Sequence, residues 1–428
     1  MVTGLVVGVV LAVAPFVPAE EGRVTGALLL GFALGWAMLA FLSARFTDQP
    51  QRWAVVPAIF MGVGGLLLLV FGSPAHGVLK WLWPPALLVL VVWMFTRSRQ
   101  QLQSRSRWLL YPVFAVLLLA SIGGVYETVS EALDQNDYQM TGELVDVGGH
   151  SLHLRCSGSG SPTVILEPGA GEMSAGLAWI EPAVADDTTV CVYDRAGRGW
   201  SEAADAPQEA AGIAIDLHTL LERGDVPGPY LLAGHSFGGL YVLTFAALYP
   251  DEVAGMVLVD STAPASPTMP APATTDGSGS YELEAHVSAL LSSTARLGVG
   301  RLLARADYGS LPSQARDEAR ASLATVSHFQ STIDEYLLAN ASTKQAAALT
   351  DLAGKPLVVL TAGSGSSAGW MADQDLLATL STNSAHRVIE GAKHAALLHD
   401  EQYAAQTTQA ILDVISSVKN DAPLLGES

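Results

Sequence analysis

The chain has 428 residues, 50% of them hydrophobic, and its 41 acidic and 22 basic residues give a formal net charge of −19. A chain this acidic repels phosphate, which argues against nucleic acid as a partner. The charge is uneven, because residues 1–126 hold 8 Lys and Arg against 3 Asp and Glu, whereas residues 127–428 hold 14 against 38. The sequence therefore divides into an apolar, slightly basic first part and an acidic second part with the composition of a soluble domain.

The first part contains five apolar runs. Runs near 20 residues match the hydrocarbon core of a bilayer, and Trp and Tyr lie near several run ends, as interface anchors do. We therefore expect an all-α bundle of about five transmembrane helices over residues 1–126, with a kink or break at Pro84-Pro85 in the fourth. The first run is the shortest, and we interpret it as a span because it lacks the basic start of a signal peptide. The runs are Val2–Val17, Val24–Leu42, Trp53–Phe71, Val78–Phe95 and Trp108–Tyr126.

The basic residues of the loops between the runs predict how the chain is oriented across the membrane. The loops after the first and third runs hold only Arg23 and Lys80, and the Arg-rich side of a membrane protein faces the cytoplasm. We therefore expect a multi-pass protein of the cell membrane whose second part is extracytoplasmic, and four spans without the first run would give the same result. The loops after the second and fourth runs hold Arg45, Arg52, Arg97, Arg99, Arg105 and Arg107.

The second part begins with an acidic linker, 127–141, and then alternates short β-rich runs with helical segments. This alternation predicts an α/β domain with a mostly parallel sheet covered on both faces. We expect its core over 142–260 and 351–418, followed by a tail, 419–428. A loop rich in Pro, Ser, Thr and Gly at 261–280 and the helical pattern up to 350 predict a lid inserted into that core.

A G-x-S-x-G motif connects a predicted strand to a predicted helix. The buried run Tyr230–Ala233 precedes Gly234-His235-Ser236-Phe237-Gly238, and an apolar helical segment follows it. Strand, tight turn and helix form a nucleophile elbow, in which the serine hydroxyl is presented above the sheet. We therefore predict Ser236 as a nucleophile, with the Phe237 N–H at the helix start as one donor to an oxyanion.

A serine nucleophile needs a base, and a histidine base needs a carboxylate. We predict His394, in a turn after the last strand, as the base; His399 is the second candidate, and His235 is expected to be structural. Asp260 ends the strand after the elbow helix, at a strand tip where catalytic groups gather. Asp373 and Asp375 remain the alternative acids because they follow the next strand.

The second oxyanion donor is expected from the turn Pro168-Gly169-Ala170-Gly171, and we select the N–H of Ala170. A further turn contains Asp194 and Arg195, which we expect to pair and to support the loop. The histidines show no metal-binding spacing such as H-E-x-x-H, so no metal site is predicted.

These motifs, in this order, resemble the α/β-hydrolase family in its serine-nucleophile branch. The resemblance covers about Gly142–Val418 and rests on Pro168–Gly171, Asp194–Ser201, the elbow with Tyr249–Val253, and Gly391–His394. It implies a Ser-Asp-His triad, a cap domain and no cofactor. The sequence departs from the family at Pro168-Gly169, where His-Gly is usual, and in having no carboxylate close behind the penultimate strand. Some members place the acid one strand earlier, which suits Asp260.

Cys156 and Cys191 lie on strands that would be neighbours in this fold. An extracytoplasmic location permits a disulfide between them. We therefore predict that they are bridged, and two buried free thiols are the alternative.

The predicted function is a membrane-anchored hydrolase of an ester, thioester or amide, with a carboxylic ester favoured. Its partner would be a small acyl compound, with lipids among the candidates. The alternative is a membrane receptor or scaffold whose hydrolase-like domain is not catalytic.

Overall fold

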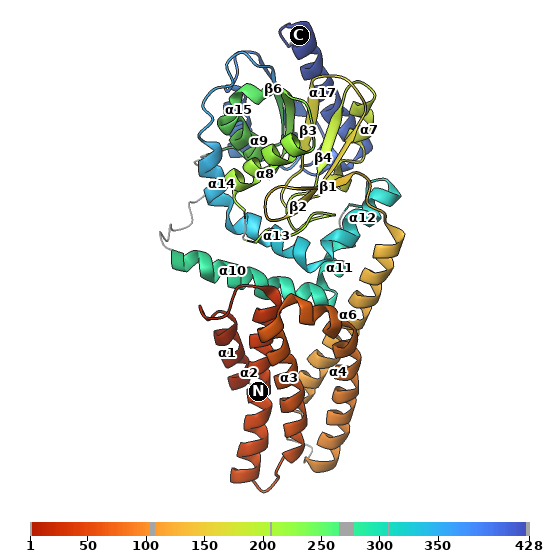
Figure 1. Ribbon diagram of the computed structural model, residues 1–428, viewed down its shortest axis with the longest axis vertical. Helices are drawn as coiled ribbons and strands as arrows, with labels where there is room; N and C mark the ends of the chain where they lie inside the picture. Colours follow the sequence, from red (N-terminus) through yellow and green to blue (C-terminus); the bar gives the residue numbers. More distant parts are fainter. Residues whose placement is uncertain (1, 103–107, 206–207, 265–277, 307, 425–428) are drawn as a thin grey trace. The chain divides into compact units, whose positions relative to one another are not determined.

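The computed structural model describes residues 2–102, 108–205, 208–264, 278–306 and 308–424. These form two compact units (Figure 1), one comprising Met1–Asp137, Thr275–Leu303 and Ala324–Gln330, the other Tyr138–Thr274, Ala304–Leu323 and Ser331–Ser428. The segment expected as a lid therefore contributes to both units. Most of the loop expected at 261–280 lies outside the described residues, as do Arg105, Arg107 and the end of the expected tail.

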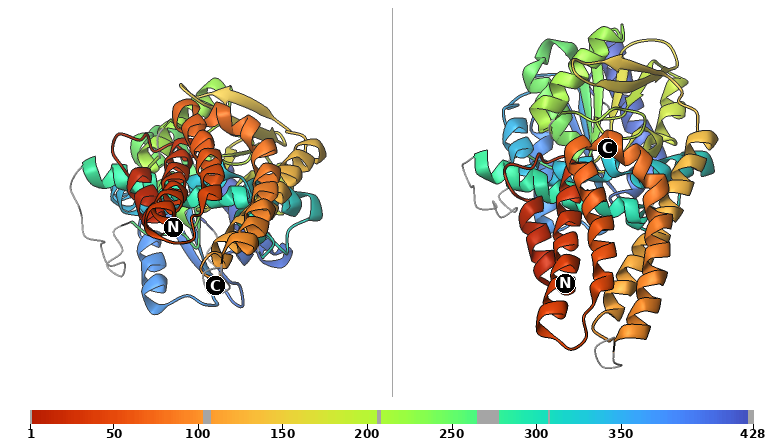
Figure 2. Two further views of the ribbon diagram at one scale, coloured as in Figure 1. Left: turned by 90° about the horizontal axis from the view of Figure 1, so that it is seen from below. Right: turned by 60° about the horizontal axis from the view of Figure 1, so that its bottom comes forward.

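The first unit is helical, and its long helices lie side by side (Figure 2). Four stretches are long and apolar enough to cross a membrane: Glu21–Phe46, Arg52–Phe71, Pro74–Gln101 and Tyr111–Asp134. They correspond to α2 (Glu21–Phe46), η1 (Arg52–Ala54) with α3 (Val55–Phe71), α4 (Ser73–Gln101) and α6 (Tyr111–Asp137). The unit also contains α1 (Val2–Ala12), α10 (Ser278–Ser292), η4 (Ser293–Leu297) and most of α11 (Val299–Ala304).

The N-terminal region has about four candidate spans rather than the five predicted. Helix α1 has 11 residues, a length of about 17 Å at 1.5 Å per residue, whereas the hydrocarbon core is about 30 Å thick. The helix ends before Pro15, which shortens the apolar run. It packs tightly on α2, because a Cβ added to Gly4 would lie 2.7 Å from Gly31 O, and one added to Gly8 2.9 Å from Leu28 O.

Helix α4 continues through Pro84 and Pro85, so the break that we allowed for does not occur. Pro84 has no N–H to donate to the carbonyl of Lys80. That carbonyl instead accepts a hydrogen bond from Thr128 Oγ1 at 3.0 Å, and the Pro84 carbonyl accepts one from Ser121 Oγ at 2.6 Å. The Thr128 hydroxyl of the neighbouring helix thus replaces the missing donor, as commonly happens around proline in membrane helices.

The second unit is built on an eight-stranded sheet with the order β1-β2-β4-β3-β5-β6-β7-β8. β1 pairs antiparallel with β2, β2 pairs antiparallel with β4, and the other neighbours are parallel. The predicted, mostly parallel α/β architecture is confirmed. The strands are β1 (Glu143–Asp146), β2 (Ser151–Ser157), β3 (Thr163–Glu167), β4 (Val190–Tyr193), β5 (Tyr230–His235), β6 (Val253–Val259), β7 (Leu357–Ala362) and β8 (Ser384–Ile389).

Helices cover both faces of this sheet (Figure 1). Because strand side chains alternate between faces, Leu232 packs into one core layer and Leu231 into the other. Leu232 lies in the layer formed with α8 (Ala210–Arg223), α9 (Phe237–Leu248), α14 (Ala339–Ala346) and α15 (Ala368–Ala378). Leu231 lies in the layer formed with α7 (Ile180–Ala185), α16 (Ala396–His399) and α17 (Glu401–Asn420). The remaining elements are η2 (Ser174–Leu177), η3 (Pro250–Glu252), α12 (Ser313–Leu323) and α13 (Val326–Leu337).

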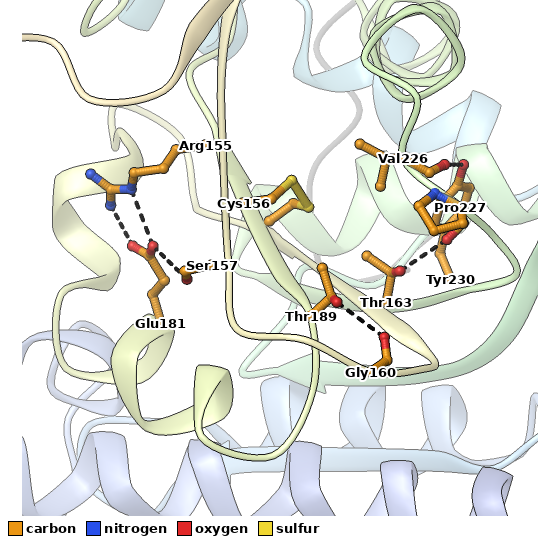
Figure 3. Close-up of a disulfide and its surroundings, with 11 residues drawn as sticks. Arg155, Cys156, Ser157, Gly160, Thr163, Glu181, Thr189, Val226, Pro227 and Tyr230 are labelled. Carbon is orange, nitrogen blue, oxygen red and sulfur yellow. Dashed lines mark hydrogen bonds and ion pairs between the residues drawn. A yellow bond between two sulfur atoms is a disulfide. The ribbon is translucent and has the colours of Figure 1, made fainter.

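A disulfide joins Cys156 of β2 to Cys191 of β4 (Figure 3). The two residues face each other in the antiparallel register, with their Cα atoms 4.1 Å apart. On the same strand, Arg155 Nε donates to Glu181 Oε1 of α7 at 3.1 Å, and Ser157 Oγ donates to the same oxygen at 3.1 Å. The outer hairpin is thereby fixed to β4 by a covalent bond and to α7 by an ion pair.

Candidate active site

Ser236 lies in the turn between β5 and α9 with φ 53° and ψ −122°. A non-glycine residue with positive φ is strained, typically by about 1–3 kcal/mol. Three backbone hydrogen bonds hold it: its N–H donates to Val259 O at 3.1 Å, and its carbonyl accepts from Thr262 N at 3.0 Å and Gly239 N at 3.1 Å. Strand β6 and the residues that follow it therefore keep the serine in the conformation of a nucleophile elbow.

The elbow is too tight for side chains at two of its glycines. A Cβ on Gly234 would lie 2.7 Å from Gly238 O, and a Cβ on Gly238 would lie 2.3 Å from Glu167 O. Both distances are below van der Waals contact with backbone atoms, which cannot move aside. The spacing of the motif therefore has a steric cause, and it brings the start of α9 against the end of β3.

His394 and Asp260 meet at the carboxyl end of the sheet. His394 Nδ1 lies 2.6 Å from Asp260 Oδ2. The other oxygen of Asp260 accepts from Trp370 Nε1 at 2.7 Å and from the Ala362 N–H at 3.1 Å. Burial by itself would raise the pKa of Asp260, but the hydrogen bonds from His394 and Trp370 outweigh it, and the pKa is lowered. Asp260 is therefore an ionised, fully engaged carboxylate beside a His394 side chain that is 45% exposed.

The alternative acids lie elsewhere. Asp375 Oδ1 is 2.8 Å from Nδ1 of His386, on the neighbouring strand β8. Asp373 is buried within α15. Among the residues described, Asp260 is thus the carboxylate hydrogen-bonded to His394, whereas Asp375 pairs with His386 at the surface and Asp373 is buried on α15.

His235 and His399 share one carboxylate, Glu172. His399 Nε2 lies 3.2 Å from Glu172 Oε1, and His235 Nδ1 lies 3.5 Å from Glu172 Oε2. Burial would raise the pKa of Glu172, but the two histidines hold it well below its ordinary value. The His235 ring also packs against the His394 ring at 4.5 Å between centroids. The buried His235 ring therefore packs against the more exposed His394 ring, and His399 is a buried partner of Glu172.

The loop after β3 lies directly against the proposed nucleophile. A Cβ on Gly169 would come within 3.0 Å of Ser236 Cβ. Arg195 donates to the carbonyls on this loop, from Nη1 to Pro168 O at 2.9 Å and from Nη2 to Gly169 O at 2.6 Å. The C=O and N–H of a trans peptide point in opposite directions. With the Gly169 carbonyl fixed to Arg195, the N–H of Ala170 is therefore directed away from the guanidinium.

Glu335, on α13, holds the other end of this loop. Its Oε2 accepts from the Gly171 N–H at 3.2 Å and lies 2.6 Å from Arg198 Nη2, while its Oε1 accepts from Arg195 Nε at 2.8 Å. Arg195 also pairs with Glu167 at the end of β3. Burial would raise the pKa of Glu335, but Arg195 and Arg198 outweigh it and lower the pKa. Ala170 is thus flanked by two anchored peptides.

The expected pair of Asp194 and Arg195 is replaced by separate partners. Asp194 Oδ2 lies 2.9 Å from His153 Nδ1, and Asp194 Oδ1 accepts from the Ser174 N–H at 2.8 Å. Arg195 instead bonds the loop after β3. The support that the usual histidine would give to that loop is supplied here by Arg195, Glu335 and Glu172, whose Oε2 accepts from the Gly169 N–H at 3.1 Å.

The residues that support the loop after β3, and Trp370 beside Asp260, belong to no motif from which the sequence alone would predict their role. Glu172 and Glu335 lie outside any motif and reach the site from a turn and from a helix 164 residues beyond Gly171. Trp370 likewise follows a Gly- and Ser-rich turn. Among the described residues, no group of three or more His, Cys, Asp or Glu is arranged to hold a metal ion.

The family model of the alpha/beta hydrolase fold matches residues 162–401. The match exceeds half of the chain and includes the turn at Ser236, Asp260, His394 and the loop Pro168–Gly171 after β3. The chain therefore belongs to the alpha/beta hydrolase family, and its N-terminal helices add a membrane region to that fold.

Only a part of each curated relative aligns with this chain. An uncharacterized protein of Schizosaccharomyces pombe is 35% identical over 139 residues, covering 26% of each chain. An uncharacterized vacuolar membrane protein of Saccharomyces cerevisiae is 31% identical over 132 residues, 26% of this chain and 20% of that protein. The 2-(acetamidomethylene)succinate hydrolase of Mesorhizobium japonicum is 34% identical over 118 residues, 28% of this chain and 42% of that protein. This chain thus spans well under two thirds of these relatives.

Solved structures resemble the chain at a lower level of identity. A thermophilic esterase from Thermogutta terrifontis is 21% identical, with a TM-score of 0.46 over 63% of this chain and 94% of that one. The enol-lactonase from Burkholderia xenovorans LB400 is 18% identical, with a TM-score of 0.46 over 64% of this chain and 100% of that one. The assignment to the family rests on the family model.

Proposed function

We propose that the second unit is a serine hydrolase that cleaves a carboxylic ester, thioester or amide, with esters as the first choice. Ser236 Oγ attacks the carbonyl carbon, and His394 Nε2 takes the hydroxyl proton and returns it to the leaving group. Water, from which His394 takes a proton, then attacks the acyl-enzyme, and the carboxylic acid and free Ser236 are released. The single observation that carries this proposal is the 2.6 Å contact between His394 Nδ1 and the buried Asp260. Asp260 follows β6 and the strained Ser236 follows β5, which are neighbouring parallel strands.

The role of Asp260 follows from that contact. A carboxylate at Nδ1 requires the proton to reside on that nitrogen, which leaves Nε2 free to act as a base. The same carboxylate stabilises the imidazolium that forms during attack. Trp370 and the Ala362 N–H fix the second oxygen of Asp260, so that its orientation is retained through the cycle.

The oxyanion would be held by the N–H groups of Phe237 and Ala170. Phe237 begins α9, and the first amides of a helix have no partner within the helix. The anchoring of Gly169 and Gly171 supports the same assignment for Ala170, because preorganised donors stabilise a developing negative charge most effectively.

We further propose that this unit acts outside the cytoplasm of a cell-membrane protein on a small acyl compound, with lipids among the candidates. The Arg-rich loops between the spans favour that orientation, and the disulfide fits an oxidising compartment. Two relatives bear the name of a hydrolase, which fits a hydrolytic reaction here.

The first experiment is covalent labelling of the full chain with a fluorophosphonate. We expect labelling that is lost in Ser236→Ala and retained in Ser364→Ala, which changes a serine in the loop after β7. With an ester substrate, Ser236→Ala should lower kcat by up to about a millionfold. A chain that binds no fluorophosphonate, or a Ser236→Ala variant with near-normal turnover, would contradict the proposal and favour a non-catalytic receptor or scaffold.

A further inference from the structure

Helix α10 carries three of its four large aliphatic side chains on its exposed side, whereas the fourth, Leu290, is partly buried against the cluster that contains Ala289. Leu283, Val287 and Leu291 are 51%, 36% and 48% exposed, and residues four apart lie on one face of a helix. The buried side chains of this helix are small or polar: His286, Ser288, Ala289 and Ser292. This distribution is the reverse of that of a helix on a water-soluble protein, whose apolar face is buried.

The two elements that follow α10 show the same reversal. Arg301 Nη2 pairs with Glu127 at 3.0 Å and its Nη1 with Asp134 at 2.8 Å, so the guanidinium faces α6. The neighbouring Leu302 and Leu303 are 62% and 54% exposed. In η4, Arg296 pairs with Glu21 of α2 at 2.9 Å, while Leu297 is 44% exposed. The two arginines are thus paired with carboxylates of α2 and α6, whereas the neighbouring leucines are exposed.

This segment is packed on the candidate spans. His286 Nε2 lies 2.6 Å from Val17 O, and Ala289 belongs to a core cluster with Val24 of α2. On α6, a Cβ at Gly123 would lie 2.2 Å from Leu297 O, so the two backbones are in direct contact. In Figure 1, α10 runs across the direction of the long helices of the same unit. A helix that runs across the direction of membrane spans is oriented along the membrane surface.

We propose that α10, η4 and α11 form an interfacial element that lies in the bilayer surface, with Leu283, Val287 and Leu291 against the acyl chains. The occupant of this apolar stripe is the lipid bilayer, because the stripe belongs to the unit that holds the spans and the segment packs directly on two of them, through Ala289 against Val24 and through Leu297 against Gly123. An in-plane helix of this kind buries its apolar side at the boundary between headgroups and acyl chains. The inference concerns membrane contact and holds whether or not Ser236 is catalytic.

The test uses depth-dependent quenching on the full chain in phosphatidylcholine nanodiscs. Because both natural cysteines are in a disulfide, a cysteine introduced at 283, 287 or 291 can be labelled selectively with an environment-sensitive fluorophore. Leu376→Cys on α15, 56% exposed in the second unit, is the aqueous control, and Leu66→Cys on α3, 54% exposed, is the membrane control. The label is then read with brominated phosphatidylcholines carrying bromine near or far from the carbonyl groups.

We expect the three α10 positions to show blue-shifted emission and loss of intensity with brominated lipid, strongest for bromine near the carbonyls. Leu66→Cys should be quenched by deeper bromine, and Leu376→Cys should not be quenched. Water-like emission at all three α10 positions would overturn the proposal. Blue-shifted emission without quenching by brominated lipid would also overturn it, because the stripe would then be covered by protein.

Discussion

Asp260 illustrates how a single residue is selected from several candidates by its surroundings. Three aspartates follow strands β6 and β7, and each could in principle face a histidine. Asp260 lies 2.6 Å from His394, whereas Asp375 lies 2.8 Å from His386. The selection depends on where β8 and the turn after it place His394, which is 134 residues away from Asp260 in the chain.

Substituting these aspartates separates their roles. Asp260→Asn should fold but turn over about ten-thousandfold more slowly, because the imidazole can then adopt the wrong tautomer. Asp375→Asn should retain near-wild-type kcat, since its carboxylate pairs with His386 on an exposed surface. Steady-state kinetics on an ester, with thermal unfolding as a check on folding, measures both. Equal activity of all variants would mean that another group orients His394.

Glu335 is a positioning residue in this scheme, because it contacts the loop that carries Ala170. In Glu335→Gln the buried guanidinium groups of Arg195 and Arg198 lose their shared charge partner. Breaking a buried pair typically costs about 3–5 kcal/mol of stability, and a misplaced oxyanion donor lowers kcat by about a hundredfold or more. We expect kcat to fall with KM nearly unchanged, which marks an interaction made in the transition state.

The matched control for this prediction is Glu318→Gln on α12. Its carboxylate accepts from Trp200 Nε1 at 2.8 Å, so the substitution perturbs the same inserted segment without touching the loop after β3. A similar loss of kcat in both variants would show that general loosening of the helices, rather than the loop, is responsible.

At the scale of elements, the outer hairpin of the sheet depends on its crosslink. β1 and β2 meet the parallel sheet only along β4, at the edge of the domain. The disulfide ties the hairpin to the sheet at Cys156 and Cys191, next to the pair of Arg155 and Glu181. An edge hairpin is expected to separate early when the domain unfolds.

Removing the disulfide should therefore destabilise the second unit. The bond closes a sequence separation of 35 residues, for which loop-closure entropy gives a loss of about 4 kcal/mol. We expect the double variant Cys156→Ser with Cys191→Ser to unfold at lower denaturant concentration, as followed by circular dichroism in detergent. Addition of reductant to the wild type should shift the midpoint in the same direction, and an unchanged midpoint in both would contradict the prediction.

At the scale of the whole molecule, the candidate spans and their loops decide on which side the hydrolase acts. The loops after α2 and α4 carry the Arg residues, and the chain leaves α6 at the opposite end of the bundle. With four spans, the predicted orientation is the same as with five, because the first run lies before all the others.

Protease accessibility tests this orientation. Protease added to intact spheroplasts should digest the region from Tyr138 onward and leave the span region protected, since the six-to-two bias of Lys and Arg predicts that this region is outside. An antibody to a C-terminal tag gives the readout, and lysed spheroplasts give the control. Complete protection before lysis would reverse the topology.

The sequence by itself determined the features that depend on local pattern. Alternating β-rich and helical segments predicted the parallel sheet, runs of about 20 apolar residues predicted the membrane helices, and the G-x-S-x-G motif predicted the strained turn at Ser236. Each single element in these patterns is encoded within some 20 consecutive residues, because hydrogen bonding and burial along one element follow its own periodicity.

The tertiary structure decided what depends on contacts between distant segments. The Thr128 hydroxyl of α6 bonds the carbonyl of α4 that Pro84 leaves without a donor, and Glu335 completes the support of the loop at Gly171 from 164 residues away. Apolar length alone overestimated the spans, since α1 ends at Ala12 before Pro15. The exposed position of Leu283, Val287 and Leu291 on α10 could be recognised only once the buried side of this helix was known. Such features arise from packing between elements, whose partners no local pattern in the chain specifies.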